Sequence, residues 1–333
     1  MHHRIAPAAL RGRLRRRLAG LGLALVASLS GLAHAAYPEQ PIRVVVPFAA
    51  GSGTDNGVRT MTNYVSQQTG WTMIVDNKPG GNGIIGVQDF LRAAPDGYTI
   101  ISTGNTTHAA NPVLFKQLPY DPVADFVPIH RSLVAPLALF VSPKHKIGSV
   151  KELVDFIRSK PPGSVTYAAG SASHRASAER FNQEAGLETV HVPYKSSPQA
   201  LTDLMGGHVD FMFVDTAAVV GQIQGGAMKP LAVTSPQRVP VIPEVPTMIE
   251  SGFPGYVMSG WSVMFAHKGT PPEAVDALRK ALADYSHSET GRKYRDAMGA
   301  YYEDLTPEQL QAFIRDELKL YQDIYRKAGI QPE

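Results

Sequence analysis

Cysteine is absent from the 333-residue chain. The protein therefore forms no disulfide bonds, and its stability has to come from packed hydrophobic cores. It also has no thiol for the lipid attachment that follows some export signals. We therefore expect a free protein rather than a lipoprotein.

The local patterns of common catalytic and metal sites are missing as well. The sequence has no G-x-S-x-G segment of the kind that carries a nucleophilic serine. Its histidines show no H-x-x-x-H or H-E-x-x-H spacing. We therefore expect no metal site and no enzymatic activity. A hydrolase that uses Ser171 or Ser173 is the weakest alternative.

Acidic residues are absent from the first 35 positions. This segment contains six arginines, then an apolar stretch from about Leu18 to Leu32, then Ala33-His34-Ala35. A basic region, a short apolar region and a small-residue cleavage site are typical of a signal peptide. We predict a signal peptide over residues 1–35, cleaved near Ala35, and a mature protein in the periplasm. The Arg15-Arg16-Arg17 run leaves the twin-arginine route open beside general secretion, which is favoured.

The rest of the chain has no excess of positive charge. The whole chain carries 32 basic and 29 acidic residues, so removing the six arginines of the signal leaves a net charge of −3. A mildly acidic protein without a basic cluster is a poor nucleic-acid binder. We therefore expect no nucleic-acid partner.

Short apolar strands alternate with glycine-containing loops and helices after the signal. This alternation indicates the α/β class with largely parallel sheets. The predicted strands lie at 42–46, 73–75, 98–101, 137–141, 165–168, 191–194, 209–214, 231–234 and 263–266.

The strand order suggests two lobes. A second unit begins near residue 137, and the chain returns to the first unit near 262. We predict that each lobe is a mostly parallel sheet flanked by helices, and that two crossover strands join the lobes as a hinge. The first lobe would comprise residues 36–138 and 262–333, and the second lobe residues 139–261.

Polar and glycine-rich loops follow several of the predicted strands, where ligands of open α/β sheets bind. The loop at 48–55 joins a strand to a helix, so its peptide N–H groups and the helix N-terminus suit a carboxylate. The predicted ligand-binding residues are Phe48, Ala49, Ala50, Gly51, Ser52, Gly53, Thr54, Asp55, Asn105, Thr106, Thr107, His108, Gly170, Ser171, Ser173, His174, Asp215 and Thr216.

Each of these segments also fits an ordinary turn or helix cap. Asp55 or Thr54 fits the cap of the helix that follows. The carboxylate of Asp215 would either hold a ligand amine or hydroxyl, or merely cap the next helix.

Gly81-x-Gly83-x-x-Gly86 matches the G-x-G-x-x-G pattern of dinucleotide-binding loops. Asn77-Lys78-Pro79 separates these glycines from the preceding strand, and no ribose-binding acid follows at the expected place. We therefore expect no cofactor, and a shaped loop instead.

Eight short motifs, taken in order, resemble one family. They are Pro47-Phe48-x-x-Gly51-x-x-x-Asp55, Asn77-Lys78-Pro79-Gly80, Ala94-Pro95-Asp96-Gly97-Tyr98-Thr99, Asn111-Pro112, Val192-Pro193-Tyr194-Lys195, Asp203-Leu204-x-x-Gly207-x-Val209-Asp210, Leu231-Ala232-Val233-Thr234-Ser235 and Pro243-x-Val245-Pro246-Thr247. Together they look like the extracytoplasmic solute receptors of tripartite tricarboxylate transporters, the Bug family. The resemblance runs from about Tyr37 to the C-terminus.

The resemblance implies a two-lobed periplasmic binding protein that closes on a small carboxylate and delivers it to membrane subunits. In this family the first-lobe loop, here Phe48 to Asp55, holds the carboxylate through backbone groups and ordered water. The walls opposite would be Asn105–His108, Gly170–His174 and Asp215-Thr216. The implied receptor is a monomer without a cofactor.

The sequence departs from the family pattern in the first loop, where Ala50-Gly51-Ser52 replaces the usual P-G-G. Ser196 replaces a glycine, and the segment around Gly170 is shortened. These departures affect pocket shape and ligand size. A receptor that signals through a sensor partner is the alternative to transport.

Overall fold

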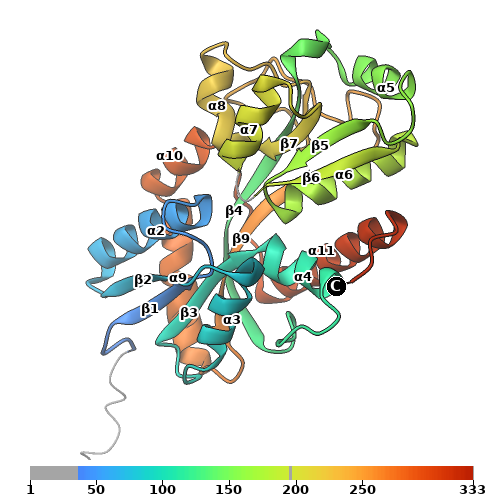
Figure 1. Ribbon diagram of the computed structural model, residues 1–333. Coiled ribbons are helices and arrows are strands. Elements are labelled where there is room, and N and C mark those ends of the chain that lie inside the picture. Colours follow the sequence, from blue (N-terminus) through green and yellow to red (C-terminus); the bar gives the residue numbers. More distant parts are fainter. Residues whose placement is uncertain (1–36, 195–196, 333) are drawn as a thin grey trace, which may run out of the picture. The chain divides into compact units, whose positions relative to one another are not determined.

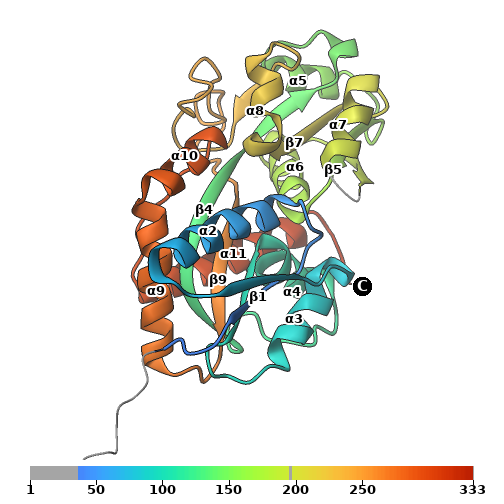
Figure 2. The same cartoon turned by 90° about the vertical axis from the view of Figure 1, so that its left-hand side faces the viewer.

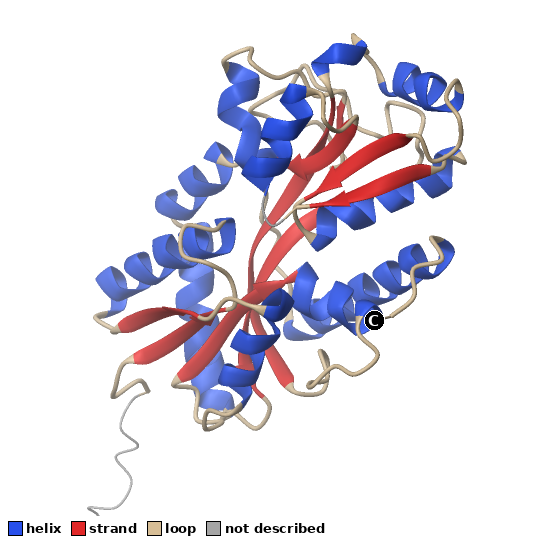
Figure 3. Cartoon of the chain, in the orientation of Figure 1, coloured by secondary structure: helices blue, strands red, loops and turns tan. Residues whose placement is uncertain are grey.

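The computed structural model describes residues 37–194 and 197–332, so the predicted signal peptide lies outside the described residues. The described strands form one hydrogen-bonded network in the order β2-β1-β3-β9-β4-β7-β5-β6, with β8 paired to β4 (Figure 1). Helices flank the strands in both lobes (Figure 3). The predicted two-lobed α/β architecture is confirmed.

The first-lobe sheet consists of three parallel strands followed by the antiparallel β9 and the first part of β4. Four of the five residues of β1 are buried, as expected for a strand that is covered on both faces. Helix α2 packs against α9, and α3 packs against β1 and β3. The elements are β1 (Ile42–Val46), α2 (Gly53–Thr69), β2 (Met73–Asn77), η1 (Gly81–Gly83), α3 (Ile84–Leu91), β3 (Thr99–Gly104), η2 (Thr106–Ala110), α4 (Asn111–Leu114), β9 (Ser259–His267), α9 (Pro272–His287), α10 (Glu289–Ala297) and α11 (Pro307–Lys327).

The second-lobe sheet has β5 between the parallel strands β6 and β7, while β7 pairs antiparallel with the end of β4. Helix α6 packs on β5 and β7. The elements are β4 (Phe126–Val141), η3 (Pro143–His145), α5 (Val150–Arg158), β5 (Val165–Ala169), α6 (Ala172–Ala185), β6 (Thr189–Pro193), α7 (Ser197–Gly206), β7 (Phe211–Asp215), α8 (Thr216–Gln224) and β8 (Ala232–Val233).

Strand β4 runs through both lobes (Figures 1 and 2). Its first part pairs with β9 up to Pro136, and its last five residues pair with β7 from Leu137 onward. The prediction of a strand that begins at 137 was wrong, because the strand begins at Phe126. Pro128 and register shifts beside it interrupt the pattern that would have indicated the strand. The predicted lobe boundaries at residues 138 and 262 stay a prediction.

The antiparallel pairings orient the two parallel sets of strands toward each other. Strand β9 is antiparallel to both β3 and β4, so β1, β2 and β3 run in the direction of β4, toward the second lobe. Strand β7 is antiparallel to β4, so β5, β6 and β7 run toward the first lobe. The loops at the carboxyl ends of the two sets therefore face one another.

Helix α11 joins the hydrophobic cores of the two lobes. Tyr321 and Tyr325 on this helix are fully buried and belong to one cluster with Phe265 of the first lobe and Phe213 of the second. The Tyr325 hydroxyl donates to the carbonyl of Ala172 at 3.3 Å. Helix α11 is therefore fastened to both lobes.

Gly104 at the end of β3 leaves no room for a side chain. A Cβ atom there would lie 2.0 Å from the carbonyl oxygen of Trp261 on β9. We expect Gly104→Ala to lower the free energy of unfolding by about 2 kcal/mol or more, because the strands have to separate. Urea denaturation measures the loss.

The matched control is Gly221→Ala on α8, where nothing lies within 4 Å of an added Cβ. It should be neutral, or stabilising by about 0.5 kcal/mol through lower chain entropy. Equal stabilities for the two variants would contradict the close approach of β3 and β9.

Candidate functional site

The loop between β1 and α2 is shaped by its own hydrogen bonds. Ser52 caps α2 by accepting the Asp55 N–H, and Gly51 adopts a φ of 80°, which glycine reaches without strain. Of the two caps considered in the sequence, neither Asp55 nor Thr54 is the cap residue. The loop is therefore a fixed turn with Ala49, Ala50, Gly51 and Gly53 exposed on its surface.

Asp55 is only 1% exposed, and its carboxylate is occupied within the loop. It accepts the Gly51 N–H at 2.8 Å, the Asn77 amide at 2.9 Å and the Arg59 guanidinium at 3.0 Å. Burial alone would raise its pKa, but these hydrogen bonds and the Arg59 charge hold the pKa below its usual value. The structure therefore places Asp55 as the residue that orders the loop, and direct ligand contact stays a prediction.

The first turn of α2 offers unused donors. Within the described residues, the N–H groups of Gly53 and Thr54 have no acceptor, unlike those of Gly51, Ser52 and Asp55. The positive end of the dipole of this 17-residue helix lies at the same place. A carboxylate that arrives here would meet both.

The Asn77–Gly83 segment supports this loop from the side. Asn77 donates its amide to the carbonyl of Phe48 at 3.1 Å as well as to Asp55. Gly86 packs so closely on Pro47 that a Cβ would lie 2.7 Å from it. The glycines that match a nucleotide-binding pattern thus pack α3 onto the end of β1.

Asn105, which follows β3, is buried and its amide group is fully used. Its oxygen accepts the Trp261 N–H at 2.9 Å, and its nitrogen donates to the Ser259 carbonyl at 3.1 Å and the Tyr321 hydroxyl at 3.0 Å. The side chain therefore ties the loop to the start of β9 and to α11. Its predicted role as a ligand contact stays a prediction.

The next residues divide between surface and core. Thr106 is half-buried, whereas Thr107 and His108 are fully buried. The His108 ring stacks on Phe265 with centroids 4.2 Å apart, and burial lowers its pKa to about 3. His108 is therefore a neutral residue of the first-lobe core. Ligand contact by Thr106, Thr107 or His108 stays a prediction.

In the second lobe, Ser171 caps α6 by accepting the His174 N–H and lies 3.0 Å from the Ser173 hydroxyl. Ser173 is buried and Gly170 is half-buried. Of this group, Gly170 and Ser171 are the more accessible.

His174 and Asp215 come together although 41 residues separate them. The fully buried His174 ring places Nε2 3.0 Å from Oδ2 of Asp215. The neighbouring Thr216 is fully buried, and its hydroxyl donates to the carbonyl of Pro136. Asp215 is thus the more accessible of the predicted pair at the end of β7.

The loops of the two lobes meet beside α11. The η2 turn packs against both α6 and α11, and Gln183 of α6 donates to the carbonyl of Ile324 at 2.7 Å. The predicted segments Asn105–His108, Gly170–His174 and Asp215–Thr216 therefore share one region.

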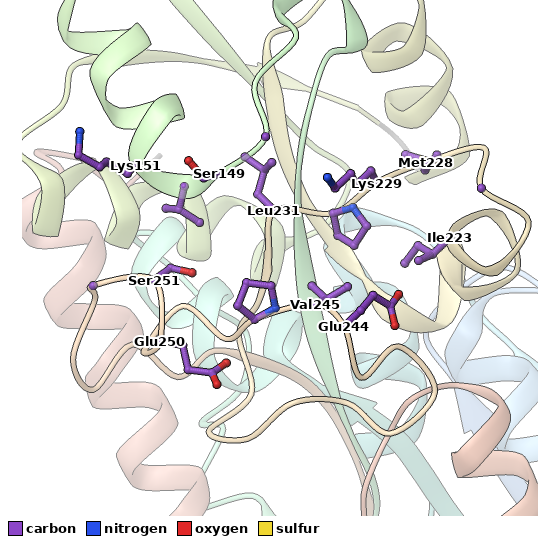
Figure 4. Close-up of a pocket in the computed structure, with 16 residues that line it drawn as sticks. Ser149, Lys151, Ile223, Met228, Lys229, Leu231, Glu244, Val245, Glu250 and Ser251 are labelled. Carbon is purple, nitrogen blue, oxygen red and sulfur yellow. The ribbon is translucent and has the colours of Figure 1, made fainter.

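The described residues line a small cavity at the predicted site and a larger one away from it. A cavity of about 20 Å³, room for one water, lies beneath Gly53 and Thr54. A much larger space of about 740 Å³ opens on the second lobe between α5, α8 and the 244–252 loop (Figure 4). It shares no residue with the predicted site, and no motif in the sequence indicates it.

In the described part of the chain, no cluster of three or more His, Asp or Glu residues is placed to hold a metal ion. Among the described helices, none has the length and apolar character of a membrane span.

Comparison with known proteins identifies the family. Residues 58–330 match the model of the tripartite tricarboxylate transporter family receptor. The chain belongs to this receptor family. The protein BugT of Bordetella pertussis is 33% identical over 88% of this chain and 90% of its own length.

Solved receptor structures agree with this assignment. The periplasmic binding protein BugD is 32% identical, covers 89% of this chain and 100% of its own, and superposes with a TM-score of 0.78. The R. palustris protein Rpa4515, solved with adipate, is 30% identical with the same coverage of 89% and 100%, and a TM-score of 0.82. The chain is therefore a receptor of the periplasmic binding protein class, as the resemblance implied.

Sequence reasoning missed three residues that hold the receptor's site loops. Trp261, Glu317 and Tyr321 all bond to Asn105 or to one another, yet they lie more than 150 positions away from it in the chain. Tyr321 belongs to the apolar stripe of the last helix, which does not indicate a partner, and no pattern in the sequence marks Trp261 or Glu317.

Glu317 gives this cluster a pH dependence. Burial raises the pKa of its carboxyl to about 7, although the Trp261 indole N–H donates to it at 2.7 Å. Because this pKa lies above the ordinary value of 4.5, the stability that the neutral acid provides is fully present below about pH 4.5 and is lost as the pH rises from there to about 7.

We therefore expect Glu317→Gln to become more stable relative to the native protein between pH 5 and pH 8. The melting temperatures of both proteins at the two pH values measure this, with the exposed Glu188→Gln as control. A difference in melting temperature that stays constant with pH would contradict the assignment.

Proposed function

We propose that this receptor binds a small carboxylate between its two lobes and delivers it to the membrane subunits of a tripartite transporter. The observation that carries the proposal is the exposed first turn of α2, with its unused N–H groups at the positive end of the helix. Family membership and the adipate in Rpa4515 support a carboxylate ligand.

In this proposal the carboxylate accepts the N–H groups of Gly53 and Thr54, and ordered water joins it to the exposed loop at Ala49 and Ala50. Backbone donors and water bind an anion without a cationic side chain. The accessible residues of the other segments, Thr106, Ser171 and Asp215, form the remaining wall.

The receptor is exported by the signal peptide at residues 1–35, acts in the periplasm as a monomer and turns over no substrate. Hydrogen bonding supports the absence of a serine nucleophile, because the His174 ring bonds to Asp215 and not to Ser171 or Ser173. The Thr107 hydroxyl bonds to the neighbouring His108 ring, but both side chains are fully buried.

Binding of a carboxylate should stabilise the mature protein by mass action, by about 2.7 kcal/mol at a hundredfold excess over Kd. A thermal-shift screen of mono-, di- and tricarboxylates measures the shift. Unsubstituted amides of the same acids are the controls. A carboxylate library that leaves the melting temperature unchanged would refute the proposal.

The role of the α2 N-terminus can be tested at a single N–H group. Gly53 is the first helical residue, with no atom within 4 Å of an added Cβ, and Ser52 before it is extended. Proline fits this position and removes the N–H. We expect Gly53→Pro to fold normally and to weaken carboxylate binding by about tenfold or more, the value of one hydrogen bond to a charged group.

Gly53→Ala is the matched control, since it adds a Cβ but keeps the donor. It should bind as the native receptor does in isothermal titration calorimetry. Equal affinity of the proline and alanine variants would show that this N–H does not contact the ligand.

A further inference from the structure

Asp215 ends β7 and stands at the N-cap position of α8, but its side chain makes no capping hydrogen bond. Of the two roles that the sequence left open for this carboxylate, the capping role is thus wrong. The side chain is 34% exposed, in the region where the loops of the two lobes face each other. The carboxylate is therefore available for another purpose.

The fully buried His174 holds this carboxylate in a fixed position. Its Nε2 donates to Oδ2, and in the described residues Oδ1 receives no donor. A Cβ atom at Gly260 would lie only 2.9 Å from Oδ1, so glycine keeps the space beside that oxygen free of a side chain. One oxygen is thus anchored and the other is an unused acceptor.

The free oxygen of Asp215 matters for ligand choice because of the charges among the predicted ligand-binding residues. The predicted ligand-binding residues include no lysine or arginine. The carboxylate of Asp55 is paired with Arg59 and bonded within its own loop, and His108 is a neutral residue of the core. Asp215, which is half-buried, is therefore the one charged side chain of the predicted set that is both accessible and not neutralised by a cation. It repels a bare carboxylate unless the ligand offers a donor.

We propose that Asp215 makes this receptor select carboxylates that carry a hydrogen-bond donor, an ammonium or a hydroxyl group, over unsubstituted acids. This inference rests on the proposed function. The ligand carboxylate binds at α2, and its donor reaches the free oxygen of Asp215 across the site. An ammonium group is favoured over a hydroxyl because it also neutralises the carboxylate.

The test compares acids of equal length that differ in one substituent. Titration calorimetry of the full mature receptor would use three matched sets: succinate, malate and aspartate; glutarate, 2-hydroxyglutarate and glutamate; and propionate, lactate and alanine. In the set that binds, we expect the ammonium acid to bind best and to exceed the unsubstituted acid by at least about tenfold.

The variant Asp215→Asn keeps the shape and a hydrogen-bond acceptor for His174 but removes the charge. We expect the preference for the donor-bearing acid to fall to about threefold or less, with tighter binding of the unsubstituted acid. Asp155→Asn on α5 is the control, since it removes an exposed carboxylate that pairs with Lys151. It should leave the preference unchanged.

The outcomes separate the two proposals. If an unsubstituted acid binds as tightly as its substituted partners, or if Asp215→Asn keeps the native preference, the inference about Asp215 is overturned and the carboxylate receptor stands. If no acid in these sets and no acid in the carboxylate screen binds, the proposed function itself fails. If the screen yields only ligands that carry no hydrogen-bond donor, the inference about Asp215 alone is overturned. The native ranking alone decides the inference if Asp215→Asn does not fold.

Discussion

The exchange of partners along β4 is the constraint on which the arrangement of this receptor depends. Up to Pro136 the strand is bonded to β9, and from Leu137 it is bonded to β7. Because both pairings are antiparallel, the two sets of parallel strands point toward each other. The same exchange brings Asp215, the partner of Leu137, next to the start of β9, so a second-lobe carboxylate lies beside first-lobe chain.

Local features of the fold could be predicted from the sequence. The apolar runs predicted most strands. Ser149, with a glutamate three residues later, and Thr306, with a glutamine three residues later, match the sequence pattern of helix caps, and both residues cap their helices. The first half of β4 could not be predicted. With Pro128, His130 and Arg131 in it, this segment shows neither the alternating nor the continuous apolar pattern of a strand. Its stability comes from β9, a strand more than 120 residues later in the chain, and no local pattern reports such pairing.

For the site, the sequence indicated which loops converge but not how each side chain is used. Asp55, Asn105 and Asp215 are all polar residues just after a strand. Only the three-dimensional packing shows how each is used. Asp55 orders its own loop, the amide of Asn105 is hydrogen-bonded to β9 and α11, and Asp215 keeps one oxygen free. These differences depend on partners between 4 and 216 positions away, and residue type alone does not distinguish them.

The attachment of α11 to both lobes has a consequence for the time course of ligand exchange. Wider separation of the lobes on this side has to pull Tyr325 out of its buried position and break the bond between Gln183 and Ile324. A solute that reaches the loops through such a movement enters and leaves at the frequency of that movement. The residence time of the solute is then governed by a helix that supplies none of the atoms proposed to bind it.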